Sequence, residues 1–118
     1  MKNKYSLPIR NYADGKYLVA TARTRNGKPL GSNARLIPLA NGDFALRYCY
    51  TNIVTWHRDD TFTLNHDGWM TRSTRVWMEA ATGISIREVD GEWEIRLSDV
   101  WTPYCNGMTI DPKQTALT

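Results

Sequence analysis

The sequence predicts an α+β fold: a twisted, mainly antiparallel sheet built of hairpins, with one short helix at about 72–82 packed on one face. Two turn pairs, Asn41-Gly42 and Asp90-Gly91, lie between apolar runs and are typical of two-residue hairpins. Strand-like segments precede and follow the one stretch with helical periodicity, and this order favours an antiparallel sheet covered by a helix. With 118 residues, 42% hydrophobic and 23% charged, the chain has the size and composition of one globular domain.

The first third of the chain is expected to begin with an irregular segment, followed by a strand and a loop. We predict one domain over 1–118, with an irregular lead-in at 1–15 and a mobile tail at about 111–118. Residues 16–25 are rich in strand formers and predict a strand. Residues 26–33 combine glycine, proline and asparagine and predict a loop.

The hairpins can be given a register. A two-residue turn at Asn41-Gly42 sets Leu39 opposite Phe44. The second strand of this hairpin is expected to run past Tyr48 into the segment 53–58.

A turn at 59–61 follows. Placing Val54 and Trp56 on the same face as Phe62 and Leu64 requires an odd number of loop residues, such as a three-residue loop with a bulge.

The helix at 72–82 has recognisable ends. Thr71 is a candidate N-cap, with Ser73 as a rival, and Gly83 is a natural residue to end the helix. The expected apolar stripe consists of Val76, Trp77, Ala80 and Ala81.

Two independent signals predict the same register for the hairpin over 84–97. A turn at Asp90-Gly91 places Ile86 opposite Ile95. The same register places Arg87 opposite Glu94, a favourable cross-strand charge pair.

Several classes of protein are disfavoured. No apolar run approaches the length of a membrane span, and no signal peptide is recognisable, so we expect a cytoplasmic protein with no membrane partner. Cys49 and Cys105 are expected to be reduced and largely buried thiols. We expect no cofactor and no metal.

The charge is unevenly distributed. Residues 1–47 carry nine Lys or Arg against two Asp, whereas residues 48–118 carry six basic and ten acidic side chains, for a net charge of +3. A basic half could face an anionic partner, or it could be a solvated face with a chance imbalance.

The start of the helix is a candidate anion or phosphate site. A helix N-terminus presents free N–H groups, and two arginines there are unfavourable for the isolated helix, as at a ligand site. The alternative is capping plus surface charge, with an arginine paired to Glu79 or a nearby Asp. The candidate residues are Thr71, Arg72, Ser73, Thr74 and Arg75.

A second group of residues is a candidate partner-binding surface. Exposed aromatic residues beside basic ones can anchor a protein or stack on bases. The alternative is that large rings fill the core of a thin sheet. The candidates are Arg23, Arg25, Lys28, Trp69, Trp101 and Tyr104.

No recognised catalytic motif is present, so we expect a protein without enzymatic activity. Two histidines and three aspartates do gather in one stretch, but they match no ligand spacing, and the aspartates stand where turns favour them. These residues are His57, Asp59, Asp60, His66 and Asp67.

Part of the chain resembles a known group of proteins. The segments 51–56 (TNIVTW), 61–64 (TFTL), 68–71 (GWMT) and 73–75 (STR) resemble small, largely uncharacterised proteins of tailed bacteriophages. These share a T-x-V-V-T strand, a T-L strand, a Gly-aromatic turn and a T-x-T-T-K/R segment. The resemblance covers about residues 43–96, with Ser73 in place of the usual Thr and Asp60 in place of a common turn Gly.

The resemblance implies a phage origin and action inside an infected bacterium. We expect a non-enzymatic accessory protein that binds and inhibits a host defence or nucleic-acid-processing protein, in the manner of an anti-CRISPR protein. The alternative is a binder of nucleic acid or of a signalling nucleotide, acting through the basic face and the helix start. A homodimer is a further alternative, and an enzymatic role would need His57 or His66.

Overall fold

The structure, a computed structural model, describes residues 7–22 and 27–115 and has the predicted α+β class. Its helices and strands follow one another in this order: α1 (Tyr12–Ala20), β1 (Lys28–Gly31), β2 (Ala34–Pro38), β3 (Phe44–Tyr48), β4 (Thr51–Trp56), β5 (Phe62–Leu64), α2 (Arg72–Thr82), β6 (Ile86–Val89), β7 (Glu92–Leu97), β8 (Val100–Pro103), β9 (Thr109–Ile110) and α3 (Pro112–Thr115).

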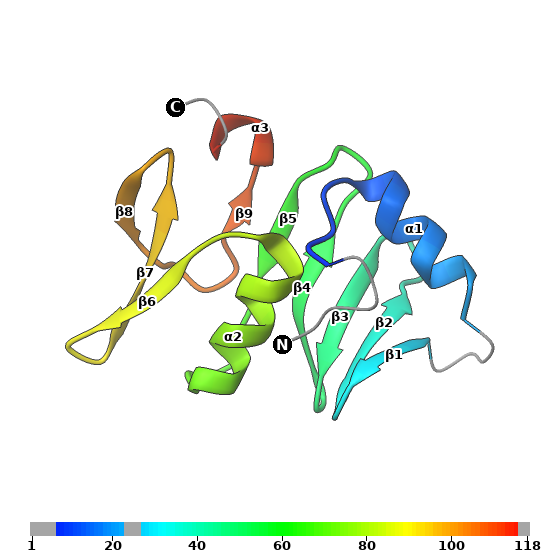
Figure 1. The fold of residues 1–118 in the computed structure, drawn as a ribbon, viewed down its shortest axis with the longest axis horizontal. Helices are drawn as coiled ribbons and strands as arrows, with labels where there is room; N and C mark the ends of the chain where they lie inside the picture. Colours follow the sequence, from blue (N-terminus) through cyan, green and yellow to red (C-terminus); the bar gives the residue numbers. More distant parts are fainter. Residues whose placement is uncertain (1–6, 23–26, 116–118) are drawn as a thin grey trace.

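The strands form two antiparallel sheets. The larger sheet has the order β1-β2-β3-β4-β5-β9, and the smaller has the order β6-β7-β8. Figure 1 shows the small sheet beyond α2, to one side of the larger sheet. Residues of both sheets belong to one hydrophobic cluster, which also contains Met78 of α2.

The larger sheet has one covered face and one polar face. Leu36, Leu46, Val54 and Leu64 stand opposite one another on four successive strands, and each is fully buried. Helix α1 packs on β2 and β3, and α2 packs on β3 and β4. Alternation along the strands therefore places the polar residues on the other face, as is common in antiparallel sheets.

Helix α1 corrects the prediction for the N-terminal region. It occupies part of the expected irregular lead-in and of the expected strand at 16–25. The Asn11 side chain accepts a hydrogen bond from the Asp14 N–H at 2.8 Å and caps the helix. Gly15 lies against the Phe44 ring so closely that a Cβ there would be 2.0 Å from it. Capping and packing therefore outweigh the local strand preference of this segment.

Two turns without glycine in their centre were not predicted. Residues 28–31, expected as a loop, form β1 and return through Ser32-Asn33 into β2. The strand expected to run past Tyr48 ends there, because the chain turns at Cys49 and Tyr50 and comes back as β4. Asn33 and Cys49 both have positive φ, at 62° and 55°.

The register predicted for the 41–42 hairpin is wrong by one residue. Phe44 pairs with Pro38 instead of Leu39. The Leu39 N–H donates to the Asp43 carbonyl at 2.8 Å, so the loop has three residues and ends at Gly42, whose φ is 92°. Such a loop adds a bulge residue to the ladder.

The next hairpin has a loop of three residues, the predicted length, but the loop is 58–60 and not 59–61. The His57 N–H donates to the Thr61 carbonyl at 2.9 Å, and Asp60 takes the positive φ of 71°. Val54 pairs with Leu64 and Trp56 with Phe62, so these four residues share one face, as expected.

Helix α2 begins after the predicted Thr71 cap and ends at Gly83, as expected. Its buried face agrees with the predicted stripe at Ala81, and Trp77 and Ala80 are partly buried. Thr74, Met78 and Ala81 are buried, whereas Val76 is 44% exposed.

The small sheet confirms the register of the 84–97 hairpin. Ile86 pairs with Ile95, and Arg87 pairs with Glu94, whose carboxylate lies 2.6 Å from the guanidinium. A further turn at Ser98 and Asp99, both with positive φ, adds β8.

Three other expectations can be compared with the described residues. Both cysteines are unpaired as expected, but they are exposed and not buried, because each lies in a turn or loop. Residues 112–115, in the expected mobile tail, form the short helix α3. Within 7–22 and 27–115 no helix has the length and apolar character needed to cross a membrane.

Candidate functional site

One end of the larger sheet carries exposed aromatic side chains. The turn between β3 and β4 projects Tyr50, which is 96% exposed. The Cys49 N–H donates to the Asn33 carbonyl at 2.7 Å, so this turn is tied to the neighbouring turn between β1 and β2. Figure 1 shows both turns and the start of α2 at the same end of the molecule, the lower edge of the view.

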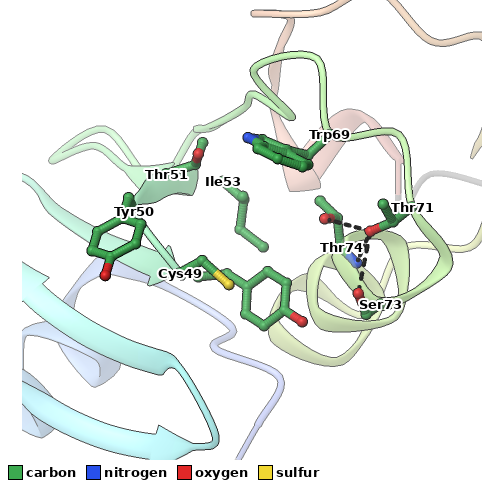
Figure 2. Close-up of a pocket in the computed structure, with 9 residues that line it drawn as sticks. Cys49, Tyr50, Thr51, Ile53, Trp69, Thr71, Ser73 and Thr74 are labelled. Carbon is green, nitrogen blue, oxygen red and sulfur yellow. Dashed lines mark hydrogen bonds between the residues drawn. The ribbon is translucent and has the colours of Figure 1, made fainter.

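A cleft of about 390 Å³ lies between the β3–β4 turn and the start of α2 (Figure 2). We call it the tip cleft. Ile53 lies at its base, and Trp69, 63% exposed, forms the wall opposite the turn. Its full lining is Tyr48, Cys49, Tyr50, Thr51, Ile53, Trp69, Thr71, Ser73 and Thr74.

Three hydroxyl groups that line the tip cleft, those of Thr71, Ser73 and Thr74, form hydrogen bonds with one another. The Thr71 Oγ1 accepts a hydrogen bond from the Thr74 N–H at 3.2 Å. It also lies within hydrogen-bond distance of the Ser73 Oγ, at 3.2 Å, and of the Thr74 Oγ1, at 3.0 Å. The remaining surface of the tip cleft is largely aromatic and aliphatic, so it suits an apolar group.

The five residues of the predicted anion site are not all directed to one place. Arg72 is exposed at the first position of α2. Arg75 is folded against the small sheet, where its guanidinium donates to the Ile86 carbonyl at 3.4 Å and its Nε is buried without a hydrogen-bond partner. The helix start therefore offers one exposed arginine, and its hydroxyls already have partners.

A second cleft, of about 320 Å³, lies on the other side of the β3–β4 turn. We call it the arginine cleft. It is lined by Asn33, Arg35, Arg47, Cys49 and Tyr50. Arg35 and Arg47 stand directly opposite each other on β2 and β3. Among the described residues neither guanidinium is paired with a carboxylate.

These two clefts share Cys49 and Tyr50 as a common wall. We call the five residues that project there the tip surface: Arg35, Arg47, Cys49, Tyr50 and Trp69. Sequence reasoning found only Trp69 among them. The available signal was a run of tyrosine, cysteine and tyrosine at 48–50, flanked on both sides by strand-like residues.

The other predicted partner-binding residues lie elsewhere. Arg23 and Arg25 are outside the described residues, and Lys28 is partly buried at the start of β1. Trp101, on the small sheet, packs on Arg87, with 4.1 Å between the guanidinium and the ring centre.

Tyr104 is half-buried in an aromatic cluster with His66 and Trp93, whose ring centres lie 5.3 and 5.2 Å from its own. Burial raises the pKa of its hydroxyl, which donates to the Asn106 side chain at 2.8 Å. These contacts give Tyr104 a role in joining the small sheet to the rest of the molecule.

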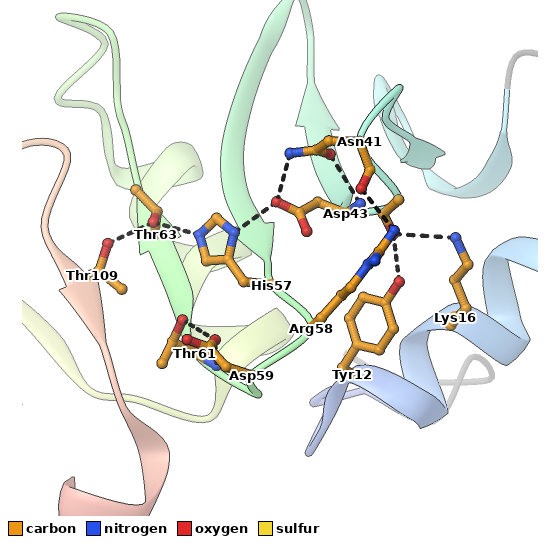
Figure 3. Close-up of polar contacts among 11 residues, drawn as sticks. Tyr12, Lys16, Asn41, Asp43, His57, Arg58, Asp59, Thr61, Thr63 and Thr109 are labelled. Carbon is orange, nitrogen blue, oxygen red and sulfur yellow. Dashed lines mark hydrogen bonds and ion pairs between the residues drawn. The ribbon is translucent and has the colours of Figure 1, made fainter.

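The predicted cluster of histidines and aspartates separates into two sites. His57 lies at the end of β4, and its Nδ1 is 2.8 Å from the Asp43 carboxylate (Figure 3). Asp59 accepts hydrogen bonds from the N–H and hydroxyl of Thr61, and the hydroxyl bond is the main cause of its lowered pKa. His66 belongs to the Tyr104 cluster. In the part of the chain that the structure describes, no three His, Cys, Asp or Glu residues gather as metal ligands.

His57 also contacts a hydroxyl group. Its Nε2 is 2.8 Å from the Thr63 Oγ1, which in turn is 2.8 Å from the Thr109 Oγ1. We call Asp43, His57, Thr63 and Thr109 the His57 network. An Asp–His–hydroxyl connection is the order found in serine hydrolases. Here, however, the hydroxyl lies within paired strands and is shared with a second threonine, so the network connects β3, β4, β5 and β9.

No protein-family model matches the chain, and no curated protein or solved structure matches it either.

Proposed function

We propose that the protein acts by binding a host protein through the tip surface and inhibiting it, without catalysis of its own. The observation that carries this proposal is the exposure of three large side chains beside one cleft. Tyr50, Trp69 and Met70 are 96%, 63% and 40% exposed, and the first two line the tip cleft. Aromatic side chains beside a cleft are frequent anchors of protein interfaces.

The chemistry of the tip cleft supports a protein partner. Its volume of about 390 Å³ suits one or two side chains. Burying an aromatic or aliphatic side chain contributes roughly 1.5–3 kcal/mol. Because the Thr71, Ser73 and Thr74 hydroxyls bond with each other, an apolar guest would not strip them of partners.

The wider context of the proposal rests on the sequence. The resemblance over about residues 43–96 supports a bacteriophage protein that acts in the host cytoplasm on a defence or nucleic-acid-processing protein. The tip surface supports binding as the mode of action. It is compatible with any host protein whose surface offers a matching side chain.

Photo-crosslinking in the host bacterium tests the proposal. The full chain is made with benzoylphenylalanine at position 50, and the matched control carries it at position 100, where Val100 is 61% exposed on the small sheet. We expect one host protein to be joined at position 50 and not at position 100. The unlabelled protein should inhibit the activity of that host protein.

The variant Y50A/W69A should lose this inhibition while keeping its fold. Both side chains are largely exposed, so their removal changes the free energy of unfolding by only about 0.5 kcal/mol. Inhibition retained by the folded double variant would exclude the tip surface as the binding site. A crosslink to a second copy of the chain would indicate a homodimer instead.

A second candidate function is binding of nucleic acid or a signalling nucleotide. The observation that favours it is the position of Arg35 and Arg47 beside an exposed tyrosine, since bases stack on aromatic rings and phosphates attract arginine. Among the described residues neither arginine has a carboxylate partner, and Arg35 donates only to the Gly27 carbonyl, at 3.4 Å. It predicts affinity for a single-stranded oligonucleotide that falls steeply as salt rises. Absent or salt-insensitive binding would exclude this function.

A further inference from the structure

We infer that the partner segment recognised by the tip surface combines an apolar side chain with neighbouring carboxylates. The apolar side chain occupies the tip cleft, and the carboxylates meet Arg35 and Arg47 in the arginine cleft. This inference rests on the proposed function and names the chemistry of the partner.

The first step is the position of the two clefts. Tyr48 faces the covered side of the sheet, where its ring lies 6.3 Å from that of Trp77 on α2. Arg47, the preceding residue of the same strand, faces the other side. The clefts therefore lie on opposite sides of the β3–β4 turn and meet at Cys49 and Tyr50. A short segment that crosses the turn contacts both.

The second step is the charge. Like charges directly opposite on neighbouring strands destabilise a sheet. Arg35 and Arg47 are such a pair, and the described residues that line the two clefts include no Asp or Glu. A carboxylate placed between the guanidinium groups relieves the repulsion and accepts paired hydrogen bonds.

The third step distinguishes a protein from a nucleic acid. Most hydroxyls at the start of α2 are committed to local bonds, and Arg75 is turned toward Ile86. A nucleotide with its base in the tip cleft would thus find few free donors for its edge and, on that side of the β3–β4 turn, one exposed arginine, Arg72, for its phosphate. An acidic segment with an apolar side chain matches both clefts at once.

Charge reversal at the arginine cleft is the test. In the crosslinking experiment at position 50, the variant R35E/R47E should reduce the yield of the host-protein adduct about tenfold or more, which corresponds to two lost charge contacts. The matched control R10E/K113E has the same net charge and alters two exposed basic residues away from the tip surface. It should keep the yield within about twofold. Circular dichroism verifies that both variants fold.

The crosslinked segment itself supplies the second readout. Mass spectrometry of the adduct should identify a stretch with an apolar residue flanked by Asp or Glu. Replacing those acidic residues with lysine should restore crosslinking to R35E/R47E and weaken it to the original chain.

The outcomes separate the two proposals. A host-protein adduct that lacks acidic residues, or one whose yield does not change in R35E/R47E, overturns this inference and leaves the proposed function standing. The absence of any host-protein adduct at position 50 overturns both. An adduct with RNA or DNA replaces both with the nucleic-acid function.

Discussion

The two ends of β3 and β4 use their polar side chains in opposite ways. At one end, Asp43 and His57 bond to each other, and the His57 network continues to Thr63 and Thr109 (Figure 3). At the other end, Arg47 has no carboxylate partner among the described residues. The comparison teaches that the same two strands hold the sheet together at one end and leave binding groups free at the other.

Polar side chains around the His57 network are also engaged in hydrogen bonds within the chain. The Arg58 guanidinium donates to the Asn41 carbonyl at 3.0 Å. The Tyr12 hydroxyl and the Lys16 ammonium group, both on α1, donate to the Gly42 carbonyl. Here the cationic groups are used to hold the 40–42 loop and α1 on the sheet. We therefore expect substitutions at this end to change stability and substitutions at the tip surface to change binding.

Removing His57 should cause the largest loss of stability at the end of the sheet that holds the His57 network. The Asp43 side chain is only 13% exposed, and H57A leaves its carboxylate with the Asn41 amide as its remaining side-chain partner. We expect the free energy of unfolding to fall by about 1–3 kcal/mol, measured by urea denaturation at pH 7. Inhibition of the host protein should be unchanged at temperatures where the variant is folded.

The double variant D43N/H57Q serves as the control, because it replaces the charged acceptor and the ring with amides that can bond to each other. It should recover part of the lost stability. If H57A is as stable as the original chain, the network is not structural, and the enzymatic reading of His57 would need a test with candidate substrates.

Acid should weaken the junction between the two sheets. His66 Nδ1 accepts a hydrogen bond from the Gly68 N–H at 2.9 Å, which requires that nitrogen to be unprotonated. Burial lowers the pKa of His66 below its ordinary value of 6.5. Because the unfolded chain then binds a proton more readily, stability is complete above about pH 6.5 and is lost as pH falls toward the folded-state pKa.

The measurement is the urea midpoint between pH 8 and pH 5 for the original chain and for H66N. The effect should be smaller than that of H57A, since the His66 ring remains partly exposed. The variant should lose the His66 part of the pH dependence. An identical pH dependence in both proteins would show that the Gly68 contact does not control the titration.

Removing one arginine of the Arg35–Arg47 pair should give the smallest change in the free energy of unfolding, and this change should be a gain. R47T removes a like charge directly opposite Arg35 and places a strand-forming residue on the polar face. We expect a gain of about 0.2–0.5 kcal/mol at low salt that disappears in 1 M salt. The same substitution should weaken partner binding. A loss of stability would mean that Arg47 is held by contacts within the chain.

The sequence predicts an element well where two local signals agree. At 84–97 the Asp90-Gly91 turn and the Arg87–Glu94 pair specify one register, and the structure has it. For α2 the cap at Thr71 and the glycine at 83 give both ends. Segment 12–20 contains residues that favour strands, and it is helical because of the Asn11 cap and the packing of α1 on the sheet, including Gly15 against Phe44.

The tip surface depends on registers that short-range signals did not supply. The turn at Cys49 and Tyr50 has no central glycine, so it was missed. The one-residue error at the 41–42 turn places Arg47 opposite Leu36, on the covered face, instead of opposite Arg35. A small error in loop length thus hides the arginine pair, and with it the arginine cleft.

The pairing of β5 with β9 divides the chain into two parts that meet at the tip cleft. The larger sheet is a simple meander, β1 to β5 followed by β9, interrupted by one long excursion over residues 65–108. The excursion carries Trp69, α2 and the whole small sheet, and the meander carries Tyr50 and the arginine pair. Because the tip cleft has one wall from each part, substitution of exposed residues in the excursion can change which partner is bound while the hydrophobic cluster shared by both parts stays the same.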